Sequence, residues 1–180
     1  MAFATIGNSA LTGSIDLTSK VTGTLPTANG GTGSTSFSPG KINQIQYSQD
    51  ADAAYIGTNS TSYVTTSQSV AITPSATNSK IQLNVFTGRP YTSGQSNAMV
   101  YNIYSSATSA YLGTGDNMAY IRSNASGGVI YSPFNIQFID TTHNTTSAIT
   151  YTVFMKSSSG WGYFAHEDSV WHIQATEILA

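Results

Sequence analysis

The chain has 180 residues and a formal net charge of −2, only 8% of its residues are charged, and it contains no cysteine. Six Lys and Arg residues cannot neutralise a run of phosphates, which excludes a strongly basic nucleic-acid binder, and the lack of cysteine excludes a disulfide scaffold. No apolar run reaches the length of a membrane helix, and the first ten residues lack a basic start and an apolar core. We therefore expect neither membrane insertion nor a signal peptide.

Residues 1–40 differ in composition from the rest of the chain. They hold seven of the sixteen glycines, and their only aromatic residues are Phe3 and Phe37. The run LTGSI at 11–15 returns ten positions later as VTGTL at 21–25. Such a segment is either a flexible linker or one of several identical copies that wrap around a common axis. The regular placement of Ile, Leu and Val favours the second interpretation. We therefore predict an extended, self-associating stem whose interface residues include Leu11, Ile15, Val21 and Leu25.

Residues 41–180 alternate apolar and polar residues over short runs, which is the period of β-strands. The clear candidates are Lys80–Phe86, Met99–Tyr104, Phe134–Ile139, Ile149–Met155 and Val170–Ile178. Weaker runs lie at 44–47, 54–56, 62–65, 69–72, 110–112, 118–121, 129–131 and 162–164. No segment keeps a helical period over three turns. The pattern predicts an all-β fold, an antiparallel β-sandwich of ten or so short strands that we call the knob.

Two segments carry a resemblance to a known family. The run VTGTLPTANGGTG at 21–33 resembles the GTLP-x-ANGGTG segment of bacteriophage tail fibres and related virion fibres. The terminal module, from ITPSATNSKIQLNV to WHIQATEI, resembles the jelly-roll knobs that end such fibres, and it is similar in outline to trimeric tumour-necrosis-factor and C1q heads. The resemblance implies a homotrimer attached to a virion by its stem, with the last strand near the threefold axis. Trp171 and Ile173, or the opposite set His172 and Gln174, would then lie at the subunit interface.

Motifs for catalysis, cofactors and metals are weak. Gly30-Gly31-Thr32-Gly33 lacks the spacing of a phosphate-binding loop. His166-Glu167-Asp168 is the only run of three titratable residues, but consecutive side chains do not easily converge on one metal ion, so we expect a solvated turn. No pair of acid and base residues stands out. We therefore expect no enzymatic activity, no cofactor and no metal.

Loops at the tip of the knob are the predicted receptor-binding site. If successive strands are antiparallel and the last one points toward the stem, the tip holds the loops at 88–97, 113–117, 140–147 and 166–169, whereas 157–160 lies at the stem end. Aromatic rings together with amides and hydroxyls are typical of sugar recognition. The predicted receptor-binding residues are Arg89, Tyr91, Asn97, Asp116, Asn117, His143, Asn144, His166, Glu167 and Asp168. Trp161 and Tyr163 form a second aromatic pair, which we expect at the stem end.

These observations lead to one functional hypothesis and one alternative. The first is a trimeric phage tail fibre whose knob binds a glycan or protein on the host surface. The alternative is a capsid decoration or head fibre protein of the same virion class. The shortness of the chain favours this alternative, or a fibre piece attached to an adaptor protein. In both, other virion proteins hold the stem and no nucleic acid is bound. A bacterial adhesin or secreted lectin is a third class, and the missing signal peptide counts against it.

Overall fold

The chain divides into two units between Pro39 and Gly40. The structure, a computed structural model, describes residues 41–94, 96–113, 117–124 and 129–179, all of which belong to the second unit. The predicted stem interface lies outside the described residues, with Leu11, Ile15, Val21 and Leu25.

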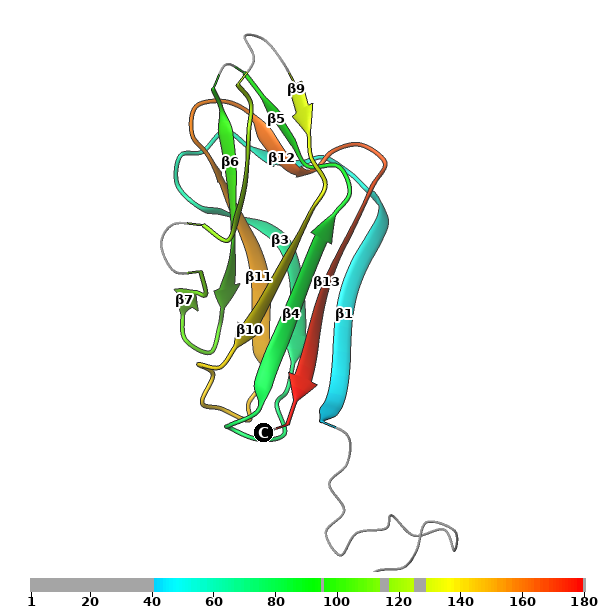
Figure 1. The fold of residues 1–180 in the computed structure, drawn as a ribbon, viewed down its shortest axis with the longest axis vertical. Coiled ribbons are helices and arrows are strands. Elements are labelled where there is room, and N and C mark those ends of the chain that lie inside the picture. The colour runs from blue at the N-terminus through cyan, green and yellow to red at the C-terminus, as the bar shows by residue number, and fades with distance from the viewer. Residues whose placement is uncertain (1–40, 95, 114–116, 125–128, 180) are drawn as a thin grey trace, which may run out of the picture. The chain divides into compact units, whose positions relative to one another are not determined.

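A four-stranded antiparallel sheet forms the front of this unit in Figure 1. Its strands, in spatial order, are β1 (Ile42–Ala53), β13 (Ser169–Ile178), β4 (Lys80–Thr87) and β10 (Phe134–Asp140). Ile178 lies opposite both Ile42 and Lys80, and the Leu179 amide donates to the Lys41 carbonyl at 2.7 Å. We call this end of the unit the terminal end and the opposite end the distal end.

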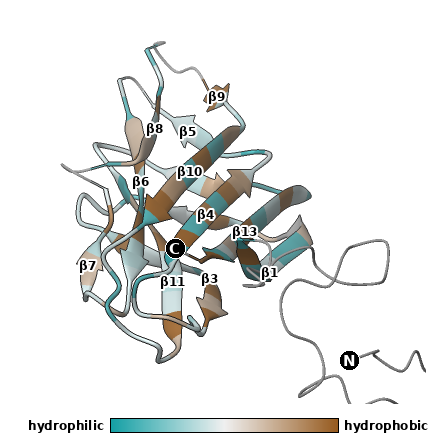
Figure 2. Ribbon diagram, turned by 60° about the horizontal axis from the view of Figure 1, so that its bottom comes forward, coloured by the Kyte–Doolittle hydropathy of each residue, from teal (hydrophilic) through white to brown (hydrophobic). Residues whose placement is uncertain are grey.

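A second antiparallel sheet packs behind the first. It contains β3 (Val64–Ile72), β11 (Ile149–Ser157), β6 (Ala98–Ser105) and β7 (Ala110–Tyr111), and β8 (Ala119–Arg122) also pairs with β6. Every second residue of β4 is buried, as the alternation in KIQLNVFT predicts, and Figure 2 shows the alternating hydropathy along this strand. Leu83 of β4 is fully buried, as are Ile103 and Val153 of the second sheet, so the core lies between the two sheets.

A third, smaller sheet lies at the distal end, at the top of Figure 1. Its strands are β2 (Ile56–Thr58), β12 (Gly162–Ala165), β5 (Tyr91–Ser93) and β9 (Val129–Tyr131). None of the four exceeds four residues. They extend the sandwich beyond the ends of its long strands.

The strands pair in a nested order, the first with the last. β1 pairs with β13, β2 with β12, β3 with β11, β4 with β10, β5 with β9, and β6 with β8. One long antiparallel hairpin that rolls up on itself produces this order. The described residues are therefore all-β and antiparallel, and their pairing is compatible with the expected jelly roll. The trimeric state stays a prediction.

The five clear strand predictions are confirmed to within two residues at each end, but two of the five loop placements are wrong. A third loop, at 113–117, lies mostly outside the described residues. The loops at 88–97 and 166–169 are distal, as expected. Ser157–Gly160 is also distal, because β11 runs from Ile149, opposite Ile72, toward that end. Asp140–Ser147 lies at the terminal end, because Asp140 pairs with Ile81. The error arises at β12, which is too short to cross the sandwich and stays within the distal sheet.

The part of the chain that the structure describes contains no helix long and apolar enough to cross a membrane.

Candidate functional site: an aromatic cluster at the distal end

Three tyrosine rings lie side by side on one face of the distal sheet. Tyr163 of β12 lies opposite Tyr91 of β5, which lies opposite Tyr131 of β9. Directly opposite residues share a face, and the ring centroids are 5.3 Å apart for Tyr91 and Tyr163 and 5.2 Å for Tyr91 and Tyr131. Gly57 of β2 leaves room for this row, because a Cβ there would lie 2.2 Å from Cδ1 of Tyr163.

His166, in the turn between β12 and β13, contacts every ring of this row. Its imidazole stacks on Tyr91 with a centroid distance of 4.8 Å and meets Tyr163 edge-on at 5.3 Å. The ring centroids of Tyr55 and His166 are 4.6 Å apart. The ring of Trp161 stacks beside that of Tyr163, with their centroids 6.1 Å apart. We call these six residues the distal aromatic cluster: Tyr55, Tyr91, Tyr131, Trp161, Tyr163 and His166.

The outer members of the cluster face solvent. The exposed fraction is 55% for Tyr55, 51% for Trp161 and 44% for Tyr131, whereas Tyr91 and Tyr163 are half-buried. Aromatic rings of this size are normally buried to a larger extent. Because the inner rings support the outer ones, the exposed rings are held in place without being covered.

Charged groups flank the cluster on one side. The Arg89 guanidinium carbon lies 5.0 Å from the centroid of Tyr131, and Nη1 donates to the Glu167 carbonyl at 3.0 Å. Glu167 and Asp168 have φ values of 27° and 53°, in the left-handed region that side chains disfavour by about 1–2 kcal/mol per residue. This tight turn returns the chain into β13 and fixes the position of His166.

At two members of the cluster, His166 and Tyr55, the surroundings shift the pKa toward the neutral form. Burial lowers the pKa of the His166 imidazole, the charge of Arg89 lowers it further, and Glu167 opposes both. Burial raises the pKa of the Tyr55 hydroxyl, and the charge and hydrogen bond of the Glu167 carboxylate raise it further. A site that favours the neutral imidazole of His166 and the neutral hydroxyl of Tyr55 suits a ligand bound by stacking and by hydrogen bonds to hydroxyl groups.

Asn97 holds the loop that carries Trp161. Its side chain is fully buried, and its Nδ2 donates to the carbonyls of Ser93 and Trp161 at 3.0 and 3.1 Å. Its Oδ1 accepts from the Ser157 hydroxyl at 2.9 Å, the Ser158 hydroxyl at 3.2 Å and the Ser159 amide at 3.1 Å. One amide therefore joins the turn after β5 to the whole loop between β11 and β12. Asn97 acts as a positioning residue, because its side chain is not accessible to a ligand.

Half of the predicted receptor-binding residues come together at this site. Arg89, Tyr91, His166, Glu167 and Asp168 all lie at the distal end, in or beside the cluster.

Asn97, another predicted residue, is at the distal end too, but as the buried positioning residue described above. Three of the remaining four lie elsewhere in the unit. His143 is 2% exposed near the terminal end, where its Nε2 lies 2.8 Å from the Ser79 carbonyl. Asn144 follows it in the same loop, so the prediction that this loop reaches the tip is wrong for both residues. Asn117 lines a hollow on the side of the sandwich, beside Gln137 of β10. Asp116 lies outside the described residues.

Trp171 and Ile173 face the core between the sheets, with exposed fractions of 5% and 0%. Their side chains therefore point away from any neighbouring subunit, which corrects their expected place at an interface. The opposite set is on the outer face, where His172 stacks on Phe86 at a centroid distance of 5.5 Å and Gln174 is half-buried.

Sequence reasoning missed Tyr55 and Tyr131, and it placed Trp161 and Tyr163 at the wrong end. Tyr131 lies in a run of three residues followed by Ser132 and Pro133, and Tyr163 lies in a run of four that begins at Gly162. Such runs predict short strands, but no local pattern shows that they share a sheet. The Trp161-x-Tyr163 spacing, which puts both rings on one face of a strand, was the one usable signal.

Within the described ranges, no three His, Asp or Glu side chains are grouped closely enough to hold a metal ion. No protein-family model matches the chain, and none of the curated proteins matches its sequence significantly.

Proposed function

We propose that this protein is a bacteriophage fibre protein of the virion, and that its knob binds a glycan on the host surface through the distal aromatic cluster. The observation that carries the proposal is the row of tyrosines with Trp161, whose exposed rings lie beside hydrogen-bonding groups. The segment at 21–33, which resembles phage fibre stems, supports the assignment to a virion. The role is binding, without catalysis.

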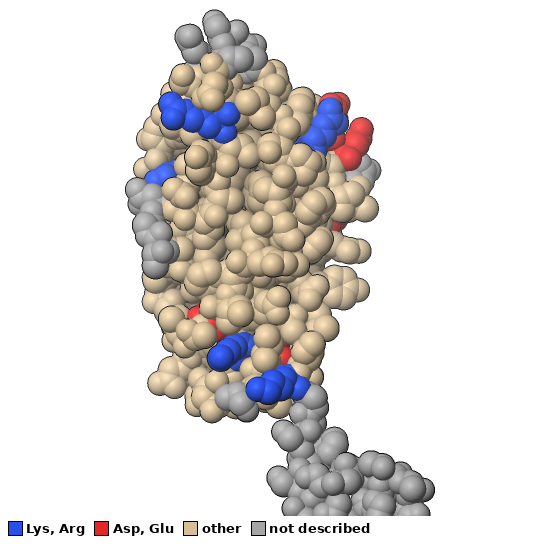
Figure 3. All heavy atoms as spheres, in the orientation of Figure 1, with Lys and Arg blue, Asp and Glu red and all other residues tan. Residues whose placement is uncertain are grey.

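A homotrimer is part of this proposal, and the outer face of the first sheet supports it. Figure 3 shows that charged side chains gather toward the two ends of this face and leave its middle without charge. β13 turns His172 and Gln174 outward there, and Tyr47 of β1, opposite Gln174, is 68% exposed. An uncharged face with exposed rings suits contact with other copies of the chain, because no like charges meet. Three knobs would also multiply a weak affinity for a repeated glycan.

The same uncharged face favours the alternative, a capsid decoration protein, because cementing needs a broad contact surface with neighbouring capsid subunits. Labelled antibodies against residues 41–180 on virion images separate the two functions. Tail labelling supports the fibre, whereas labelling over the capsid supports decoration. Deletion of residues 1–33 should abolish attachment in either case, and virions that retain the shortened chain would contradict the role of the stem.

Binding of the full chain to an array of bacterial surface polysaccharides tests the glycan site. We expect Trp161→Ala and Tyr131→Ala to weaken binding about tenfold, which corresponds to about 1.4 kcal/mol, without lowering the melting temperature. Tyr120→Ala is the control, because Tyr120 is 63% exposed on β8, outside the cluster. Binding that survives both cluster variants, or no glycan binding at all, would refute the assignment.

A further inference from the structure

A groove lies on the side of the sandwich where the edges of the two long sheets meet. One hollow of about 290 Å³ lies between β7 and β10, and a second of about 350 Å³ adjoins it at Phe138. β10 is the edge strand of the first sheet and pairs only with β4 among the described residues. Its other edge therefore presents backbone N–H and C=O groups to the groove.

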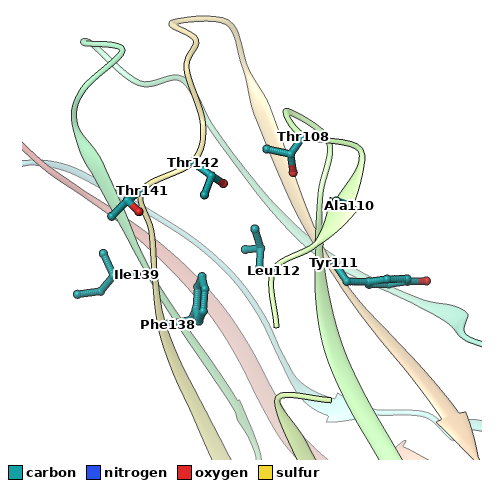
Figure 4. Close-up of a pocket in the computed structure, with 8 residues that line it drawn as sticks. All are labelled: Thr108, Ala110, Tyr111, Leu112, Phe138, Ile139, Thr141 and Thr142. Atoms are coloured by element: carbon teal, nitrogen blue, oxygen red, sulfur yellow. The ribbon is translucent and has the colours of Figure 1, made fainter. Parts of the chain in front are cut away.

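The first hollow combines an apolar floor with a hydroxyl rim. In Figure 4 the side chains of Leu112 and Phe138 point into the gap, and Thr108, Thr141 and Thr142 stand around it. The Thr142 hydroxyl donates to Asp140 Oδ1 at 2.7 Å, which leaves its lone pairs free to accept. The ring of Tyr111 points away from the hollow, so the floor is formed by Leu112 and Phe138.

The second hollow, farther along β10, also combines apolar side chains with uncharged polar ones. Its lining adds the amide side chains of Asn117, Asn135 and Gln137 to the apolar side chains of Met118 and Ile136. None of the described lining residues of either hollow is charged. An anionic or cationic ligand would lose its hydration without gaining an opposite charge, so the groove favours a neutral ligand.

We propose that this groove binds a neutral oligosaccharide that lies along the free edge of β10, one sugar ring in each hollow. Sugar rings present a C–H face that packs on apolar side chains and an equator of hydroxyls that bond to amides, hydroxyls and backbone groups. Each hollow has about the volume at the lower end of small-molecule sites, roughly 300–1,000 Å³. This site is separate from the distal aromatic cluster, and it stands without the proposed fibre function.

The test uses the full chain, labelled with ¹⁵N, and neutral hexasaccharides of glucose, galactose, mannose and N-acetylglucosamine. We expect at least one of them to shift the amide signals of Thr108, Leu112 and Phe138, whereas a hexagalacturonate leaves these signals unmoved. Thr141→Trp, which fills the hollow from its exposed rim, should weaken that affinity at least tenfold. The matched control is Thr146→Trp, an exposed threonine of the same loop that does not line the hollow, and it should bind normally.

Trp161→Ala separates this proposal from the distal site. If Trp161→Ala abolishes sugar binding and Thr141→Trp preserves it, the sugar binds at the distal cluster. That result would overturn the proposal for the groove. Binding lost only in Thr141→Trp supports the groove. Groove signals that respond to none of the four sugars, or that respond only to an extended peptide such as a Val-Thr repeat, would also overturn the proposal.

Discussion

At the scale of single residues, two buried polar side chains hold opposite ends of the knob. Asn97 fastens the distal loop that carries Trp161, and Glu177 fastens the terminal end. The Glu177 carboxylate accepts from Asn43 Nδ2 at 2.7 Å, Gln44 Nε2 at 2.8 Å and the Ser75 amide at 2.6 Å. Each side chain joins segments that are far apart in the chain. Both are therefore sites where one substitution removes several hydrogen bonds to a buried side chain.

Asn97→Ala should lower the free energy of unfolding by about 2–4 kcal/mol, because the five hydrogen bonds made by this fully buried side chain are lost. Urea unfolding measures this change. Glycan binding at the distal cluster should weaken as well, because Trp161 loses its anchor. Asn144→Ala, at an exposed asparagine, is the control and should stay within about 0.5 kcal/mol of the unsubstituted protein. A loss below about 1 kcal/mol for Asn97→Ala would contradict the positioning role.

Glu177 should make stability depend on pH in the acid range. Burial alone raises the pKa of its carboxyl, but the hydrogen bonds from Asn43, Gln44 and Ser75 outweigh burial and lower the pKa to about 2. Since this value lies below that of the unfolded chain, the carboxylate stabilises the fold above about pH 4.5. The contribution, on the order of 2–3 kcal/mol, is lost as pH falls through about 2.

Glu177→Gln tests this linkage, because its amide N–H groups would face the donors of Asn43 and Gln44. Urea unfolding should show a difference of about 2–3 kcal/mol between the variant and the unsubstituted protein at pH 7. The difference should shrink as pH falls from about 4.5 to 2. A difference in the free energy of unfolding that stays constant between about pH 4.5 and 2 would contradict the linkage.

At the scale of elements, the long strands were predictable from the sequence and the distal sheet was not. Residues 80–87 and 149–157 alternate over at least eight positions, so their period identifies both the strand and its buried face. The strands that carry Tyr91, Tyr131 and Tyr163 have three or four residues, too few for a period. Their place depends on pairing with strands distant in the chain. The candidate site was therefore predicted where a loop next to a long predicted strand carries it, as with Arg89, Tyr91 and His166, whereas Tyr131 was missed.

Gly57→Ala should disturb the row of tyrosines, because the added Cβ would overlap the base of the Tyr163 ring. We expect a loss of about 1–3 kcal/mol in the free energy of unfolding together with weaker glycan binding. Gly88→Ala is the matched control, since its Cβ would meet Val170 O at 3.4 Å and the Phe86 ring at 3.7 Å, which are ordinary contacts. In a double-mutant cycle, Tyr163→Ala should remove most of the cost of Gly57→Ala. Additive losses would show that the clash is not the cause.

At the scale of the whole molecule, the distribution of charged side chains distinguishes the outer face of the first sheet from the distal end. The middle of the outer face of the first sheet is uncharged (Figure 3). Arg89 and Glu167 lie beside the distal cluster, and Asp168 is in the same turn. A protein with 8% charged residues has little charge to distribute, so its placement is informative. Face and cluster lie on different sheets, so contact between copies through the face would leave the cluster free.

Gln174→Glu should shift the full chain from trimer to monomer at micromolar concentration, because the substitution repeats one negative charge in every copy at the uncharged face. Size-exclusion chromatography with light scattering measures the mass. Thr152→Glu, on the outer face of the second sheet opposite Tyr104, is the control and should leave the trimer intact. A monomeric unsubstituted protein would refute the trimer itself, whereas a trimeric Gln174→Glu variant would refute only the choice of face.

The nested strand order also decides when this chain can fold. β1 is the first strand of the knob to leave the ribosome, and its partner β13 is the last, about 130 residues later. Every other pair closes a shorter loop inside this one, so the innermost pairs, β6 with β7 and β6 with β8, can form first and the outer pairs follow. Folding dominated by such distant pairings is slow, and the edge of β1 stays open to other strands until β13 has been made. Correct contact between copies of the knob must therefore follow synthesis of β13.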